Sequence, residues 1–144
     1  MRDDIEQFME KDHTEIDSIF ERFQERRTGT EESREEFSEF RRRLERHIRW
    51  EEDILFPEFE ERTSISGGGP TEVMRQEHDQ IRDHLGRIEE GLEAERETGE
   101  EEEKLLQTLS DHNRKEENIL YPWFDEELSE EERREILEEL RGDS

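Results

Sequence analysis

HIRWEEDILFP, residues 47–57, returns 65 positions later as HNRKEENILYP, residues 112–122. The two stretches share His at the first place, Glu at the fifth and sixth, Ile-Leu at the eighth and ninth, an aromatic at the tenth and Pro at the eleventh. The same offset carries His13 onto His78 and Ile16 onto Ile81 in the segments before them. We therefore interpret the chain as two helical hairpins of one design.

Apolar residues recur at helical spacing through four long segments. Thr28-Gly29-Thr30, SISGGGP at residues 64–70 and Thr98-Gly99 separate them. The first helix is expected over residues 3–27, and the second begins after an N-cap at Thr30 and ends near residue 61. Four amphipathic helices with short connections predict an all-α, antiparallel up-down four-helix bundle.

Ser129 and Glu132 fit a capping box, which predicts a short extra C-terminal helix over residues 129–141. The length of 144 residues fits one domain, so we expect a single domain over residues 1–144. Its two repeated hairpins are expected at about residues 3–62 and 70–126.

Charge dominates the composition: 48% of residues are charged, 26% are hydrophobic and the net charge is −25. Nucleic acid and anionic membranes are poor partners for such a surface, because both require clustered positive charge. High acidity with little Lys resembles the proteins of salt-accumulating microbes, while the alternative is a bundle with solvated Glu/Arg faces. The absence of Cys excludes thiolate sites and disulfides. With no apolar run of membrane-spanning length and no signal-peptide pattern, we expect a cytoplasmic protein.

The repeat also places chemistry-bearing residues at matching heights. His13 lies 16 residues before Gly29 and His47 lies 18 after it, which puts both imidazoles roughly 25 Å from the turn at 1.5 Å per residue. His47 and Glu51 are four apart, so they share the inward face of one helix. In the second hairpin the midpoint precedes Gly99 by about four residues, so either the loop begins before Thr98 or the helices are offset.

Four His and two Glu should therefore point into the middle of one bundle. The predicted metal ligands are His13, His47, Glu51, His78, His112 and Glu116. Buried carboxylates are costly unless they are paired or bind metal, and this donor set exceeds the needs of one tetrahedral zinc. It suits two iron ions, each with two His and with bridging Glu, although manganese or zinc could compete. The alternative is a set of core histidines hydrogen-bonded to the Glu four residues away.

Eight further residues receive interpretations of their own. Pro57 and Pro122 are expected to kink or end their helices, with Phe56, Tyr121, Trp123 and Phe124 capping the bundle. His84 lies on the flank of its apolar stripe, as a boundary residue or as a contributor to substrate access or to the surroundings of the ligands. Asp17 is expected at the surface.

At these residues the chain resembles the hemerythrin-like family, also called the HHE cation-binding domain. The resemblance runs from the first helix through Trp123 and is carried by KDHTEID (11–17), HIRWE (47–51), EHDQI (77–81) and HNRKE (112–116). It implies a four-helix bundle with a non-haem di-iron centre and the same six ligands. Oxygen-carrying members have a further His where this chain has Arg82, and Asp in place of the last Glu, so simple O₂ transport is not implied. The pattern is closer to the family's iron-sensing domains and iron–sulfur-cluster repair proteins, but the latter usually have a Cys-containing segment.

We therefore expect a di-iron protein that handles O₂, NO, peroxide or iron, in sensing, detoxification or repair. The expected partner is a small diatomic or peroxide ligand, and the oligomeric state is not predicted. The first alternative is a reversible O₂ carrier or sensor without turnover. The second is a metal-free helical interaction bundle.

Overall fold

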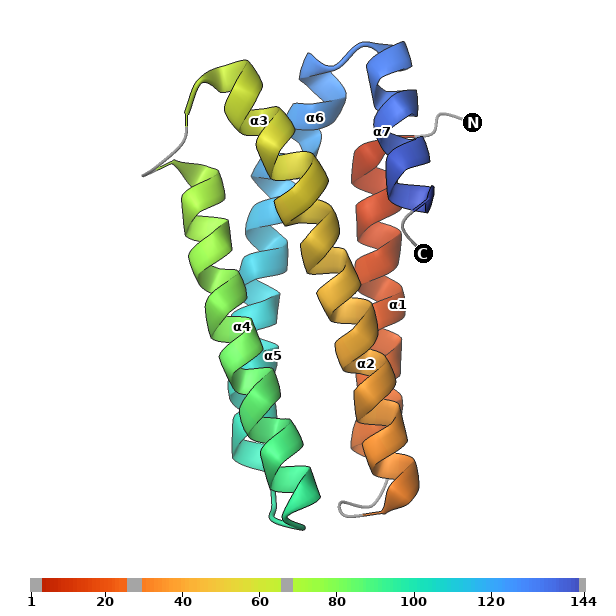
Figure 1. The fold of residues 1–144 in the computed structure, drawn as a ribbon, viewed down its shortest axis with the longest axis vertical. Coiled ribbons are helices and arrows are strands. Elements are labelled where there is room, and N and C mark those ends of the chain that lie inside the picture. Colours follow the sequence, from red (N-terminus) through yellow and green to blue (C-terminus); the bar gives the residue numbers. More distant parts are fainter. Residues whose placement is uncertain (1–3, 26–29, 66–68, 143–144) are drawn as a thin grey trace.

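The computed structural model describes residues 4–25, 30–65 and 69–142, and every element in these ranges is helical. Helices α1 (Ile5–Glu25), α2 (Glu31–Trp50), α4 (Pro70–Glu93) and α5 (Gly99–Lys115) form the antiparallel bundle (Figure 1). Helix α2 continues through the π-helical turn η1 (Glu51–Leu55) into α3 (Phe56–Thr63). Helix α5 continues through the π-helical turn η2 (Glu116–Leu120) into α6 (Tyr121–Glu127). The predicted all-α bundle is confirmed, and none of the described helices is long and apolar enough to cross a membrane.

Both predicted N-terminal caps are present. The Thr30 hydroxyl accepts a hydrogen bond from the Ser33 amide at 3.1 Å, at the start of α2. Ser129 and Glu132 form a reciprocal capping box, with contacts of 2.9 and 3.1 Å, ahead of the short helix α7 (Glu130–Gly142). The expected ends of the first helix at residues 3 and 27, the break at Thr28-Gly29 and residues 66–68 of the SISGGGP segment lie outside the described residues.

The loop of the second hairpin decides between the two alternatives left by the sequence. Helix α4 ends at Glu93 and α5 begins at Gly99, so the loop begins before Thr98. The middle of this loop is Arg96, 18 residues after His78 and 16 before His112. The heights therefore match in the second hairpin as they do in the first.

The two prolines do not end their helices, contrary to one of the expected outcomes. A proline inside a helix lacks an amide donor and its ring crowds the carbonyl four residues earlier, so an α-helical turn cannot continue through it unchanged. Here each proline follows a π-helical turn, closed by bonds from the Phe56 amide to the Glu51 carbonyl and from the Tyr121 amide to the Glu116 carbonyl. The wide turn brings residues five apart onto one face, so Phe56 and Tyr121 lie over the two Glu residues.

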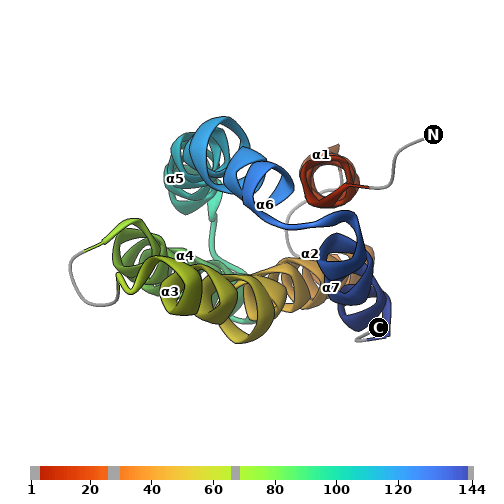
Figure 2. The same ribbon diagram turned by 90° about the horizontal axis from the view of Figure 1, so that it is seen from above.

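Two apolar clusters fill the bundle, and the six predicted ligands lie between them. The cluster at the α1–α2 and α4–α5 loop end is rich in aromatic contacts, among them Phe20 with Phe40 at 4.6 Å and Phe23 with Phe37 at 5.2 Å. The other cluster includes Ile5, Trp50 and Phe124, and α7 adds its buried leucines to it at the end of the bundle (Figure 2). The predicted metal centre is thus a polar layer enclosed by apolar layers.

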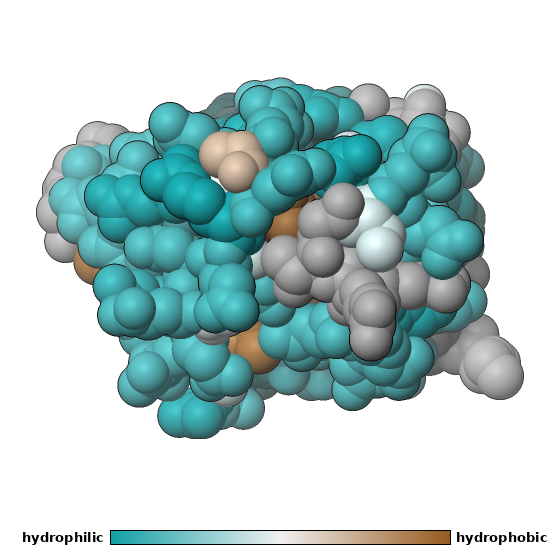
Figure 3. Space-filling view, turned by 90° about the horizontal axis from the view of Figure 1, so that it is seen from below, coloured by the Kyte–Doolittle hydropathy of each residue, from teal (hydrophilic) through white to brown (hydrophobic). Residues whose placement is uncertain are grey.

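Charged side chains are placed outside this core. Figure 3 shows hydrophilic residues over most of the surface at the loop end, with hydrophobic residues only as isolated spots. The helices can therefore carry 48% charged residues without burying most of them.

Candidate metal centre

All six predicted ligands lie together and are nearly inaccessible to solvent. Their exposed fractions run from 0% for Glu51, His78 and Glu116 to 5% for His13. One group consists of Glu51, His78, His112 and Glu116, and the other of His13, His47 and Glu116. Within each group, one ligand atom from every residue lies within 4.8 Å of the others. Glu116 belongs to both groups, which is the placement expected of a carboxylate between two metal positions.

Each imidazole directs Nε2 toward the central carboxylates. The Nε2–oxygen distances are 3.0 Å for His78 with Glu51, 3.0 Å for His112 with Glu116, 3.4 Å for His13 with Glu116 and 3.7 Å for His47 with Glu51. Among the described residues, Glu116 Oε2 has no hydrogen-bond partner of good geometry although it is fully buried. A metal ion would satisfy this carboxylate oxygen, so the donors present fit a metal centre.

The opposite nitrogen of every one of these rings is held by a second carboxylate, which the sequence analysis did not assign. We call Asp12, Glu52, Glu77 and Glu117 the outer carboxylates. The Nδ1 contacts are His47 with Asp12 at 2.8 Å, His78 with Glu52 at 2.8 Å, His112 with Glu77 at 2.8 Å and His13 with Glu117 at 2.7 Å. Each contact joins two different helical segments, and together they pass from α1 to α2, from η1 to α4, from α4 to α5 and from η2 back to α1.

This closed ring of contacts prepares the histidines for metal. A carboxylate can only accept, so Nδ1 carries the hydrogen and the lone pair of a neutral ring is left on Nε2, facing the centre. The sequence did contain a signal for the ring. An acidic residue stands directly before His13 and His78 and directly after Glu51 and Glu116, at the same offset of 65.

Cations support three of the outer carboxylates. Arg43 lies 3.0 Å from Asp12, Arg82 lies 3.0 Å from Glu52, and Lys115 donates to Glu77. Burial opposes ionisation of Glu52, but its hydrogen bonds from His78 and Arg82 outweigh burial and lower its pKa to about 2. Arg82 occupies the position at which oxygen carriers of the resembled family have an additional His. In this chain it contacts Glu52, the outer carboxylate that bonds His78.

The inner carboxylates control the histidines' protonation in the absence of metal. Burial lowers the pKa of His13, but the hydrogen bond and charge of Glu116 outweigh it and raise that pKa to about 9. Burial likewise opposes the charged form of His112, and Glu116 and Glu51 raise its pKa to about 11. Without metal, protons therefore occupy these rings at neutral pH and compensate the buried negative charge. A metal ion must displace them to bind.

Tyr121 reaches into the centre, although the sequence indicated only a bundle cap. It is fully buried, and its hydroxyl donates to Glu51 Oε2 at 2.6 Å. The same oxygen lies 3.1 Å from Glu116 Oε1, 3.1 Å from His47 Nε2 and 3.4 Å from His13 Nε2. Burial, and then the charges of Glu116 and Glu51, raise the pKa of the phenol well above its usual value. The signal in the sequence is the tenth place of the repeated stretch, which is Phe56 in the first copy and Tyr121 in the second.

His84 and Asp17 belong to neither ligand group. His84 Nδ1 contacts Glu101 Oε2 at 3.0 Å, at the start of α5 and six residues along α4 from His78. Asp17 is exposed, as expected, and faces Glu117 across the groove between α1 and α5. Partial burial raises the pKa of Asp17; the charge of His13 opposes this shift and the charge of Glu117 adds to it.

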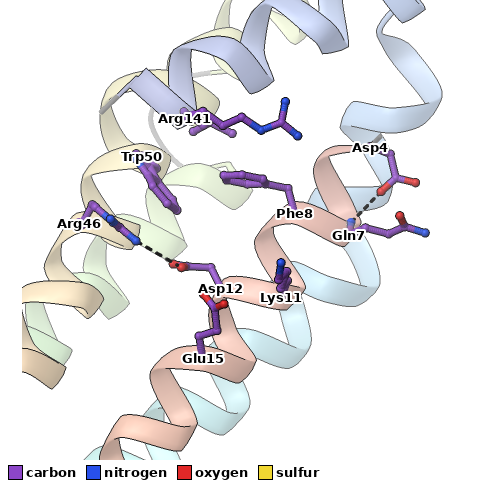
Figure 4. A pocket seen from close by; sticks show the side chains of 10 residues that line it. Asp4, Gln7, Phe8, Lys11, Asp12, Glu15, Arg46, Trp50 and Arg141 are labelled. Atoms are coloured by element: carbon purple, nitrogen blue, oxygen red, sulfur yellow. Dashed lines mark hydrogen bonds and ion pairs between the residues drawn. The ribbon is translucent and has the colours of Figure 1, made fainter. Parts of the chain in front are cut away.

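Two surface pockets flank α1 and reach the outer carboxylates. One, of about 520 Å³, lies among α1, α2 and α7 and is lined by Phe8, Trp50, Arg46 and Asp12 (Figure 4). The other, of about 530 Å³, lies between α1 and α5 and includes Glu117. Neither is lined by any of the six predicted ligands. Each pocket is lined by an outer carboxylate that bonds a predicted ligand: Asp12, which bonds His47, in the first and Glu117, which bonds His13, in the second.

The outer carboxylates can be tested by conservative substitution. We expect Asp12→Asn and Glu117→Gln each to weaken metal affinity by about 10–100-fold. In each variant one imidazole loses the charged acceptor at Nδ1 that fixes its orientation and its basicity. Affinity is measured by competition with a chelator of known strength. Asp17→Asn is the matched control, since it removes a nearby carboxylate that contacts no ligand. If all three variants and the unaltered protein bind metal with equal affinity, the outer carboxylates have no role in metal binding.

Comparison with known proteins agrees with this centre. The model of the hemerythrin HHE cation-binding domain matches residues 4–124, which leaves α7 outside the matched region. No curated protein and no solved structure gives a significant match. The matched region covers most of the chain and contains all six predicted ligands, the four outer carboxylates and Tyr121. The chain belongs to the hemerythrin HHE cation-binding domain family.

Proposed function

We propose that this protein is a non-haem di-iron protein that handles a small diatomic or peroxide ligand, or iron itself. The observation that carries the proposal is the pair of buried His–carboxylate groups sharing Glu116. Each group contributes two imidazoles, and the carboxylates lie between the groups. This is the arrangement needed to hold two cations close together.

The choice of metal rests on the donor set. Four imidazole nitrogens and two carboxylates, without thiolate, suit iron or manganese, which accept five or six mixed nitrogen and oxygen donors. Zinc in proteins is usually satisfied by four. Bound iron would supply Lewis acidity and redox chemistry at this place. The chain's own residues orient the donors through the outer carboxylates and exclude water through the apolar layers above and below.

The size of the ligand follows from the enclosure. All six predicted ligands are at most 5% exposed, and the surface pockets end at Asp12 and Glu117. Within the described part of the chain, neither of these two pockets is lined by any of the six predicted ligands, which favours a diatomic molecule or peroxide over a bulky organic substrate.

The direct test is elemental analysis of protein purified without added metal, together with anaerobic reconstitution with ferrous iron. We expect about two irons per chain, as for other two-metal sites. Exposure of the reduced protein to O₂ then separates the functional alternatives. Uptake that reverses under vacuum indicates a carrier or sensor, and irreversible oxidation indicates turnover. Less than one metal per chain after reconstitution would contradict the di-iron proposal and favour the metal-free helical bundle, in which the histidines are structural.

A further inference from the structure

We propose that the phenol oxygen of Tyr121 is a seventh metal donor, to the metal position formed by His13 and His47. The inference rests on the proposed function, because it requires a metal at this position. It makes the two metal positions chemically different: one has a phenolate and the other has none.

The geometry of the phenol oxygen is that of a donor. The oxygen lies 3.1 Å from His47 Nε2, 3.4 Å from His13 Nε2 and 3.1 Å from Glu116 Oε1. These are the three residues of the second ligand group. The hydroxyl has one hydrogen, which Glu51 Oε2 accepts at 2.6 Å. The lone pairs of the phenol therefore face a space that is shared with three other electron-pair donors, and a cation there would satisfy all of them.

The two ligand groups differ in their number of donor residues, and Tyr121 would make the numbers equal. The group around His78 and His112 has four members, whereas the group around His13 and His47 has three. Tyr121 raises the second group to four. At the equivalent place near the first group is Phe56, whose ring stacks on His78 with centroids 5.6 Å apart and planes at 11°. Phe56 packs against its histidine and has no donor atom.

The backbone holds Tyr121 in this position. The π-helical turn η2 begins at Glu116 and closes with the bond from the Tyr121 amide to the Glu116 carbonyl. The side chains five residues apart therefore point into the same layer. Tyr121 is 0% exposed and packs within the cluster that includes Leu120 and Phe124, so its hydroxyl is not in contact with solvent. A side chain fixed in this way is preorganised for ligation.

Ligation is a substitution of metal for proton and transfers no electron. The oxygen–hydrogen bond of the phenol breaks as the metal–oxygen bond forms. The proton passes to Glu51 Oε2, its present acceptor, and leaves to solvent. One proton is released for each phenolate formed, beyond those released by the histidines.

The chain contains one tyrosine, so any phenolate signal from the iron-loaded protein must come from Tyr121. Ferric phenolates absorb visible light by charge transfer, and excitation in that band enhances the phenolate ring vibrations in the Raman spectrum. We expect both signals in the ferric-loaded protein and their complete loss in Tyr121→Phe. Metal binding should also release one proton fewer in that variant. Trp123→Phe, a change of a neighbouring aromatic residue without a donor in the centre, should keep all three properties.

The outcomes separate this inference from the proposed function. Two irons per chain with no phenolate vibration would overturn the inference and leave the di-iron centre in place. Failure to bind iron at all would overturn both. If Tyr121→Phe does not fold, the Raman spectrum of the unaltered protein still decides the matter, since no other residue can produce those vibrations.

Discussion

Glu116→Ala should reduce the iron content from about two per chain to below one. Glu116 is the one residue that belongs to both ligand groups. Its loss leaves the His13–His47 group with two of its three members, and the His78–His112 group with three of its four. Two imidazoles, with the phenol oxygen of Tyr121 as the one further donor proposed there, bind iron less well than the three remaining members of the other group, so the His13–His47 position should be the first to empty. Iron content is measured after reconstitution and gel filtration.

Glu51→Ala should have a smaller effect, because Glu51 belongs only to the His78–His112 group. The other group keeps all three of its members. We therefore expect an iron content between that of the unaltered protein and that of Glu116→Ala, and none in the double variant. Glu103→Ala, on an exposed position of α5, is the control for lost negative charge. Unchanged iron in both single variants would contradict the predicted ligand set, and equal losses would contradict the special place of Glu116.

Folding of the variants is checked separately by circular dichroism. In metal-free protein the removal of Glu116 also removes the chief group that raises the pKa of His13 and His112. The pKa values of both rings should then fall, although Glu51 still raises them, so the variant loses buried negative charge and part of the buried positive charge together. We therefore expect Glu116→Ala to keep its helices, and Glu116→Gln provides the same test with the side-chain volume retained.

Much of the bundle and the grouping of the six predicted ligands could be deduced from the sequence, because both depend on periodicity. A residue's face on a helix follows from its spacing, and its height follows from its distance to the turn. His13, His47, His78 and His112 needed only these two quantities. The offset of 65 then related one hairpin to the other.

The contacts missed by this reasoning depend on quantities that spacing does not supply. Glu52 and Glu117 sit beside ligands in the sequence, yet each bonds a histidine on a different helix, and that choice depends on how neighbouring helices pack. The sequence analysis placed Tyr121 in the cap of the bundle. In an unbroken α-helix a side chain five residues after Glu116 would point away from it. The π-helical turn adds the extra residue that brings it back. Such a turn is a local response to the proline and to tertiary packing, so it is visible only in three dimensions.

The outer carboxylates also account for the positions of three basic residues. Arg43, Arg82 and Lys115 are each in contact with an outer carboxylate. Together with these three carboxylates they form neutral pairs around the centre, so among the described residues the negative charge without an Arg or Lys partner there is that of Glu51, Glu116 and the outer carboxylate Glu117. Either protons on the histidines or metal ions must balance it. Proton binding and metal binding are therefore competing states of one site.

This competition predicts opposite pH dependence of stability with and without metal. In metal-free protein the folded-state pKa values of His13 and His112 are about 9 and about 11, above the ordinary value of 6.5. A group whose pKa is raised by folding contributes stability that is complete below its unfolded pKa and is lost as pH rises through its folded pKa. Burial lowers the pKa of His78, but its hydrogen bonds to Glu51 and Glu52 outweigh burial and raise that pKa as well. Metal-free protein should therefore lose stability from about pH 6.5 upward, by at most about 1.4 kcal/mol per pH unit for each of these histidines.

At acidic pH the stability of metal-free protein changes in the opposite direction: it falls as pH falls. Burial raises the pKa of Glu51, but its hydrogen bonds to Glu116 and His112 outweigh burial and hold that pKa well below the usual value. Its contribution is present above about pH 4.5 and is lost as pH falls through the folded value. These groups together place the stability maximum of metal-free protein between about pH 4.5 and 6.5. Metal-loaded protein should instead be destabilised on acidification through the histidine range, because protons then displace the metal.

The measurement is the thermal midpoint of chelator-treated and iron-loaded protein between pH 5 and 9.5, at high salt so that the net charge of −25 is screened equally in both. Above pH 6.5 we expect the midpoint to fall in the metal-free sample and to hold or rise in the loaded one. His112→Gln should remove part of the alkaline loss without metal, whereas His84→Gln, which changes a histidine outside the centre, should leave it intact. Parallel curves for the two samples would show that protons and metal do not compete for the same nitrogens, and the buried histidines would then be structural.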